Sequence, residues 1–105
     1  MIRDMARDFA ENEIRPIAAD LDETERFPAE LYDRMAALGM MGICVPEALG
    51  GAGADALSYA LVMEELSRGY IAVGSLGTRS EIAAELILNG GSPEQKQHWL
   101  PRLAS

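Results

Sequence analysis

Cys44 and His98 are the only cysteine and the only histidine of the chain, and together they could supply a nucleophile and its base. Cys44 lies in an apolar run, residues 40–45, where a thiolate is disfavoured, whereas His98 lies in a polar segment. A metal ion would need three or four ligands, and the sequence holds no such cluster. We therefore interpret Cys44 as a small core side chain and His98 as a surface imidazole, with a Cys–His pair as the alternative. No catalytic and no metal-binding residue is expected.

A second candidate for chemistry is the adjacent pair Glu64 and Glu65, within a mostly apolar helical segment. Adjacent helical residues point about 100° apart, so the two carboxylates cannot both face solvent comfortably. We expect one of them to be buried in a structural ion pair with Arg34, Arg68 or Arg79. The alternative, an acid–base pair, would need a pocket and a second positioned group, and the sequence shows neither.

The glycine-rich segment 50–53 has the composition of a phosphate-binding loop. It lacks the Lys-Ser/Thr pair that completes a P-loop, and it lacks the strand–turn–helix spacing of a dinucleotide fingerprint. We interpret it as a turn. The six methionines, which include Met40 and Met41, are interpreted as adaptable core side chains, with a groove for flexible ligands as the alternative.

The net charge limits the classes of partner that the chain could bind. Seventeen acidic and nine basic residues give a net charge of −8, which opposes binding to nucleic acid or to an anionic membrane. Arg79 and Lys96 could still bind a local anion such as a phosphate. A single cysteine allows no internal disulfide, so we expect a cytoplasmic protein. No window has the character of a signal peptide or the length of a membrane span.

The 105 residues suffice for one domain, and 49% of them are apolar, as in an ordinary folded protein. Apolar residues recur every three or four positions between residues 2 and 21, which predicts a first helix. Pro16 lacks a backbone N–H, so we expect a kink or a break near residues 13–15.

A second helix is predicted for residues 27–39, with Pro28 in its first turn and Gly39 at its end. Residues 40–45 are too few and too uniformly apolar to classify by period, and we expect a buried extended stretch. Four of the eight residues 46–53 are glycine or proline, which predicts a loop.

A third helix is predicted for residues 55–68, with Asp55 as its N-cap. Because its middle is apolar nearly all round, we expect this helix to be central and buried. A fourth helix is predicted for residues 71–89. Gly74 and Gly77 weaken its first half, a cost usually found where something approaches the backbone closely.

Ser92 and Gln95, with Pro93 between them, predict a capping box for a fifth helix. We expect Pro101 to end that helix. The sequence shows no internal repeat and no sustained alternation typical of a strand. The fold class is therefore predicted to be all-α.

Five segments, in their order and spacing, resemble the amino-terminal helical domain of acyl-CoA dehydrogenases. They are FAENEIRP at 9–16, which is followed by Asp22 and Phe27-Pro28, LGMMGI at 38–43, VPEALGG at 45–51, MEELS at 63–67 and QKQHWLP at 95–101. The resemblance covers the whole chain, residues 1–105. It implies an orthogonal helical bundle of about five helices, without the β-barrel domain and the carboxy-terminal four-helix bundle of full-length members.

The resemblance also implies an activity for a parent enzyme. In this family a glutamate abstracts an α-proton from an acyl-CoA and the β-hydride passes to FAD, which gives the 2-enoyl-CoA. Acyl-CoA is thus implied as the substrate, FAD as the cofactor and an electron-transfer flavoprotein as the partner of a homo-oligomeric enzyme. In the family the catalytic glutamate and most flavin contacts belong to the later domains. We therefore expect the 105-residue chain alone to be inactive and not to bind FAD.

The functional share of the helical domain in the family is one wall of the acyl pocket, from the helix that here begins near Ile71. The resemblance implies that the corresponding turns carry the substrate-pocket residues Val73, Gly74, Ser75, Gly77, Thr78 and Ile82. Many members have a bulkier or polar side chain where Gly74 stands, which implies a wider or deeper pocket here.

The alternative belongs to another class: a stand-alone helical interaction module that keeps the fold without the chemistry. A reading frame that continues past Ser105 into a flavin-binding β domain would favour the enzyme, and a natural stop would favour the module. In either case a bundle of this size cannot cover helices that are apolar nearly all round. We therefore expect an exposed apolar face and self-association.

Overall fold

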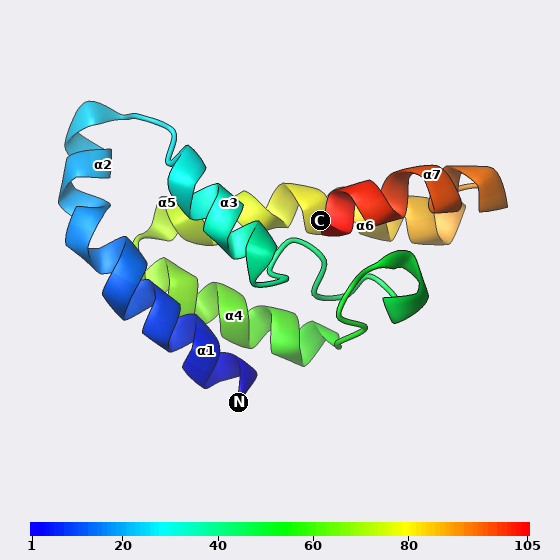
Figure 1. Ribbon diagram of the computed structural model, residues 1–105, viewed down its shortest axis with the longest axis horizontal. Helices are drawn as coiled ribbons and strands as arrows, with labels where there is room; N and C mark the ends of the chain where they lie inside the picture. The colour runs from blue at the N-terminus through cyan, green and yellow to red at the C-terminus, as the bar shows by residue number, and fades with distance from the viewer.

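Helices joined by short turns and loops make up the whole chain, which the computed structural model describes from residue 1 to residue 105 (Figure 1). There is no strand and 76% of the residues are helical, so the predicted all-α class is confirmed. The principal extents are 43 × 29 × 18 Å, which makes the molecule only about two helices thick. None of the helices combines the length and the apolar character needed to cross a bilayer.

The first helical segment bends where the sequence predicts it. Helix α1 (Ile2–Phe9) runs into a π-helical turn, η1 (Ala10–Ile14), a 3-10 turn, η2 (Arg15–Ile17), and helix α2 (Ala18–Thr24). Pro16 offers no N–H to the carbonyl four residues earlier, so regular α-helical bonding is replaced around it. The expected kink is confirmed.

The second predicted helix is α3 (Ala29–Ala37), and Gly39 follows it with a φ of +81°. Only glycine adopts this left-handed conformation without strain, as predicted for the helix end. Beyond it, residues 40–45 are buried as expected except for Cys44, which is partly exposed, but they form turns rather than an extended stretch. The carbonyls of Gly42 and Ile43 accept hydrogen bonds from amides in residues 52–54, so the chain folds back on itself instead of extending.

Helix α4 (Ala56–Gly69) begins at its predicted cap, where the Ser58 N–H donates to Asp55 Oδ1 at 2.9 Å. The expectation that this helix is central and buried was wrong for its first half. Leu57 is 67% exposed, whereas Val62 and Leu66 are fully buried. In a molecule about two helices thick, a helix is covered on one side only.

The single fourth helix predicted for residues 71–89 is interrupted, and this prediction is corrected. The structure has a short helix α5 (Ile71–Gly74) and then α6 (Leu76–Gly90), which join at Ser75. The Ser75 hydroxyl donates to the carbonyl of Ala72 at 2.8 Å and so competes with the helical backbone pattern.

Helix α7 (Pro93–Ala104) opens with the predicted capping box. The Gln95 N–H donates to Ser92 Oγ at 3.2 Å, and the Ser92 N–H donates to Gln95 Oε1 at 2.8 Å. The expectation that Pro101 ends this helix was wrong, because the helix continues to Ala104. Leu100 and Ala104, on either side of the proline, are both buried, and their burial offsets the one backbone bond that Pro101 cannot make.

Two apolar clusters hold the helices together. α1 packs beside α4, and α6 packs beside α7 (Figure 1). The smaller cluster joins α6 and α7 to the turn after α3 through Val45, Ala84, Leu100 and Ala104. The larger cluster joins the other helices through Ala6, Phe9, Ala10, Ile14, Leu21, Leu31, Met35, Met40, Met41, Ile43, Val62, Leu66 and Val73. Met40 and Met41 thus belong to the core, as expected, and α6 lies where the two clusters meet.

Candidate functional site

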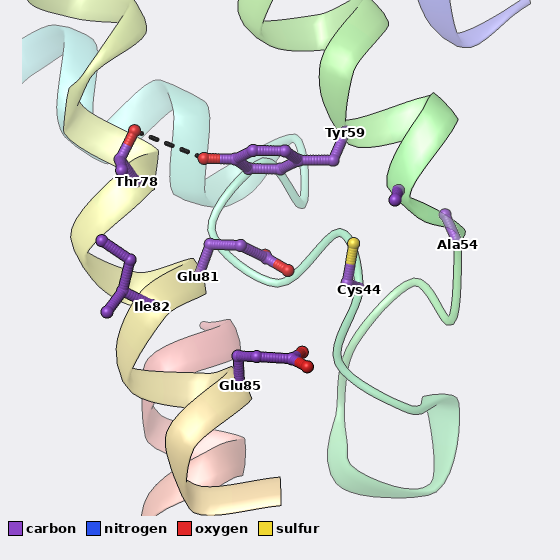
Figure 2. Close-up of a pocket in the computed structure, with 8 residues that line it drawn as sticks. Cys44, Ala54, Tyr59, Thr78, Glu81, Ile82 and Glu85 are labelled. Carbon is purple, nitrogen blue, oxygen red and sulfur yellow. Dashed lines mark hydrogen bonds between the residues drawn. The ribbon is translucent and has the colours of Figure 1, made fainter. Parts of the chain in front are cut away.

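An open hollow of about 560 Å³ lies between the first half of α6, the start of α4 and the loop that precedes α4. This volume is in the range of small-molecule sites. Figure 2 shows the side chains that surround it. The lining residues come from all three segments: Cys44, Ala54, Ala56, Tyr59, Thr78, Glu81, Ile82 and Glu85.

The loop side of the hollow is held by backbone hydrogen bonds. The amides of Ala52 and Ala54 donate to the carbonyls of Gly42 and Ile43 at 2.9 and 2.8 Å. The amide of Gly53 donates to the carbonyl of Val45 at 2.8 Å. These bonds place Cys44 and Ala54 side by side at one wall.

The same backbone hydrogen bonds show whether the glycine-rich segment 50–53 is free to bind a phosphate. Each of its four amides donates within the chain, to the carbonyls of Glu47, Pro46, Gly42 and Val45 in turn. A phosphate-binding loop must point such amides at the ligand. The interpretation as a turn is therefore confirmed, and this segment offers no cradle for the phosphates of a flavin cofactor.

A hydrogen bond crosses the upper rim of the hollow. The Tyr59 hydroxyl on α4 donates to Thr78 Oγ1 on α6 at 3.3 Å (Figure 2). Tyr59 is partly buried and packs against the larger cluster, so its ring is fixed as well as its hydroxyl. The bond thus ties α4 to α6 at the rim.

Cys44 is an unreactive thiol rather than a nucleophile. Burial raises its pKa to about 12, and the nearby carboxylates of Glu81 and Glu85 add to the rise. Its sulfur lies 3.6 Å from the carbonyl oxygen of Asp55, to which the S–H donates. His98 is exposed on α7 and its ring packs edge-on against Trp99, with centroids 4.7 Å apart. The interpretation of His98 as a surface imidazole is confirmed, and no group of side chains is arranged to hold a metal ion.

Glu81 and Glu85 point from α6 across the hollow toward the loop of Cys44 (Figure 2). Neither forms an ion pair, although Asn89 Nδ2 donates to Glu85 Oε1 at 2.7 Å. Our sequence reasoning missed both residues. Their spacing of four on a predicted helix places them on one face, and that was the available signal.

The six predicted acyl-pocket residues do not all line the same hollow. Thr78 and Ile82 line the hollow of Figure 2, and Gly77 is buried behind it near Met40 and Met63. Gly74 is buried against α4, where a Cβ would collide with the hydroxyl of Ser67.

Val73 and Ser75 do not line this hollow. Val73 is fully buried in the core and forms part of the floor of a hollow between α2 and α5. Ser75 is exposed and lines a hollow of about 400 Å³ between α3 and α6, together with Phe27, Tyr32, Leu76, Arg79 and Ser80. The six residues therefore follow one helical segment without converging on one cavity.

The predicted ion pair of the Glu64–Glu65 dipeptide is present. Glu65 is 3% exposed and accepts hydrogen bonds from Arg7 and Arg68, whereas Glu64 is exposed. Hydrogen bonds from Arg7 hold the pKa of Glu65 below its usual value. Arg68 was among the expected partners and Arg7 was not. Since its oxygens are occupied by arginines, Glu65 is a structural group.

These features define a class of protein: a small all-helical domain, two layers thick, with a ligand-sized hollow against one helix. Residues 1–105 match the family model described as acyl-CoA dehydrogenase, N-terminal domain. The chain belongs to this family, and the resemblance drawn from its five segments is confirmed.

Several curated relatives extend this result. The chain is 53% identical over its full length to (2S)-methylsuccinyl-CoA dehydrogenase of Cereibacter sphaeroides and covers 19% of that protein. It is 49% identical over 99% of its length to the short-chain specific acyl-CoA dehydrogenase of Clostridium acetobutylicum, of which it covers 28%. It is 44% identical over its full length to the human mitochondrial short-chain specific enzyme, of which it covers 26%.

A solved structure agrees with the fold. It is described as "Electron transferring flavoprotein of Acidaminococcus fermentans: Towards a mechanism of flavin-based electron bifurcation". The TM-score is 0.91 at 39% identity, over 99% of this chain and 28% of that one. The chain thus spans less than a third of the length of each of these relatives.

Proposed function

We propose that this chain is the helical domain of a flavin-dependent acyl-CoA dehydrogenase, which converts an acyl-CoA to the 2-enoyl-CoA. The observation that carries the proposal is the family match over residues 1–105. The relatives named above are dehydrogenases of CoA esters, and the chain covers only a part of each. We further propose a cytoplasmic homo-oligomer that passes its electrons to an electron-transfer flavoprotein.

FAD is the proposed cofactor of the whole enzyme, and it would supply the acceptor for the hydride. Residues 1–105 do not fit this group by themselves, because the amides of segment 50–53 all bond within the chain. The one carboxylate nearly fully buried in the domain, Glu65, is held between arginines. We therefore assign flavin binding and proton abstraction to other parts of the enzyme, and pocket formation to this domain.

The proposed share of this domain is one wall of the acyl pocket, along α5 and the start of α6. Thr78 and Ile82 would contact the acyl group from the hollow of Figure 2, and Ser75 from the hollow beside α3. Gly77 lies buried behind this wall, near Met40 and Met63. Val73 and Gly74 would support the wall from inside, since both are buried under it.

The names of the relatives divide the proposed substrates into two chemical classes. Short-chain acyl groups end in a methyl group. A methylsuccinyl group ends in a carboxylate. The wall of this domain would meet the distal end of either group, and its side chains would therefore discriminate between them.

The proposal is tested on the full-length protein encoded around this domain. We expect bound flavin, visible as a yellow colour, and formation of 2-enoyl-CoA from short acyl-CoA esters. Ile82→Trp, which fills the hollow, should lower kcat/KM for hexanoyl-CoA about 10-fold or more relative to butyryl-CoA. His98→Trp is the control, because His98 is exposed on α7 and lines none of the hollows. Absence of flavin and of any CoA-ester oxidation would contradict the proposal.

Exposed apolar side chains are compatible both with the enzyme and with the alternative of an interaction module without catalysis. Leu57, Ile71 and Leu86 are 67%, 76% and 69% exposed. Neighbouring domains of an enzyme or a protein partner would cover them equally well. The flavin content of the full-length protein separates the two readings, because a module would be purified colourless.

A further inference from the structure

Arg79 differs from most of the basic residues of this chain in having no acidic partner. The chain has nine basic side chains, eight of them arginines. Six arginines form ion pairs with carboxylates: Arg3, Arg7, Arg15, Arg26, Arg34 and Arg68. Arg79, Arg102 and Lys96 remain, in a chain with 17 carboxylate residues. A guanidinium left unpaired among so many carboxylates is available for an external anion.

The surroundings of Arg79 form a hollow rather than a flat surface. Its volume is about 400 Å³, and it lies between α3 and α6. Phe27 and Tyr32 form an aromatic wall, with ring centroids 6.1 Å apart. Ser80 is 9% exposed and adds a hydroxyl to the lining. Arg79 is the only charged residue of the lining, so the hollow combines aromatic and aliphatic walls with one positive charge.

The hollow of Figure 2, on another face of α6, has the opposite charge. Glu81 and Glu85 point into it, and no cation neutralises them. An acyl tail that ends in a carboxylate is repelled there and attracted by Arg79, so the two hollows discriminate by charge. Ser75, one of the acyl-wall residues proposed above, lines the Arg79 hollow and links it to that wall.

We propose that Arg79 binds the distal carboxylate of an acyl-CoA whose acyl group ends in a second carboxylate. This inference rests on the proposed function and specifies its substrate class. Guanidinium and carboxylate groups match in a two-pronged, charge-assisted contact, which is stronger than a contact between neutral groups. Phe27, Tyr32 and Leu76 would cover the methylene groups next to that carboxylate. Arg79 is then a specificity-determining residue, outside the groups that move the proton or the hydride.

The test compares succinyl-CoA and butyryl-CoA as substrates of the full-length enzyme. The two esters have four-carbon acyl groups and differ in a carboxylate that replaces a methyl group. We expect Arg79→Gln to lower kcat/KM for succinyl-CoA about 10- to 100-fold and to leave that for butyryl-CoA within about twofold. Arg79→Lys should recover part of the loss, because it restores the charge without the planar fork. Dissociation constants of both esters, measured calorimetrically, should follow the same pattern.

Arg102→Gln is the matched control, because Arg102 is also exposed and unpaired but lies on α7 outside this hollow. Its substrate ratio should equal that of the wild type. An unchanged ratio in Arg79→Gln would overturn the inference, as would an equal loss in Arg102→Gln, which would indicate a general effect of net charge. An enzyme that oxidises butyryl-CoA but shows none of these differences would support the proposed function and contradict the inference about Arg79. A protein that neither binds nor oxidises either ester would contradict both the proposed function and the inference about Arg79.

Discussion

The guanidinium of Arg7 on α1 forms an ion pair with the carboxylate of Glu65 on α4, 58 residues later in the chain. Arg7 Nη2 donates to Glu65 Oε1 at 2.9 Å and Arg7 Nε donates to Glu65 Oε2 at 3.3 Å, which is the two-pronged geometry that arginine favours. Arg68 Nη1 adds a third hydrogen bond at 3.1 Å. This contact fastens the first helix to the middle of the fold.

Glu65→Gln should lower the melting temperature of the chain by several degrees. The substitution replaces the charge-assisted hydrogen bonds from Arg7 and Arg68 with weaker bonds to a neutral amide at a site that is 3% exposed. Glu64→Gln, on the exposed neighbouring position, should change it little. Thermal unfolding followed by circular dichroism measures both variants. Equal melting temperatures would show that the contact contributes nothing to stability.

The same pair predicts how stability depends on pH. The folded-state pKa of Glu65 lies below its ordinary value, so the ion pair contributes fully above the unfolded-state pKa of about 4.3. Its contribution is lost as the pH falls through the lower, folded-state pKa, because the native carboxylate then takes up a proton. The difference in melting temperature between wild type and Glu65→Gln should therefore be constant from pH 7 to 5 and shrink below about pH 4. A difference that grows on acidification would contradict this assignment.

Gly74→Ala and Gly77→Ala should have opposite effects on stability. At Gly74 a Cβ would collide with the Ser67 hydroxyl and lie 3.1 and 3.2 Å from its Cβ and Cα, so we expect a loss of about 1–3 kcal/mol. At Gly77 the nearest atoms are 3.5 and 3.6 Å away, which is ordinary contact. There alanine should stabilise the helix by about 0.5–1 kcal/mol. Urea unfolding of the two variants measures both signs, and a stabilised Gly74→Ala would refute the close packing.

Cys44 should react very slowly with alkylating reagents in the folded protein. With a pKa of about 12, its thiolate fraction at pH 8 is roughly a thousandfold below that of an ordinary cysteine. Iodoacetamide labelling followed by mass spectrometry should therefore be slow in buffer and fast in guanidinium chloride. Glu81→Gln should speed the reaction of the folded protein, because it removes a negative charge near the thiolate. Labelling at the unfolded rate in buffer would show that Cys44 is not protected.

Pro101→Ala should stabilise the protein by about 1–3 kcal/mol, because a proline inside a helix costs about 3 kcal/mol relative to alanine. The new N–H would complete the backbone pattern of α7. Pro93→Ala is the control, since the first turn of a helix needs no such donor and the change should be near neutral. Destabilisation by Pro101→Ala would indicate that the proline ring itself contributes to packing.

The local features of this fold could be predicted from the sequence because each depends on residues within about one helical turn. Asp55 caps α4 through an amide three residues away, and Ser92 and Gln95 close their capping box over the same distance. Pro16 perturbs only the turn around itself. The family resemblance was likewise readable, since it depends on the order of short segments in the chain.

Some predictions failed where tertiary packing outweighed a local preference. Pro101 is a helix breaker by itself, but burial of Leu100 and Ala104 keeps α7 continuous through it. The pattern of residues 71–89 indicated one helix, yet the helix is divided where Gly74 packs closely on Ser67 of α4. In both places a contact outside the local pattern decides the outcome.

The sequence by itself determined the helical class, the caps, the kink and the family of this domain, because these follow from spacing and side-chain type. Only the tertiary structure decided that Arg7 pairs with Glu65, that Glu81 and Glu85 point into one hollow and that Arg79 lines another. Segments far apart in the chain meet through the shape of their packed surfaces. That shape depends on all the buried side chains at once, and no short pattern of residues encodes it.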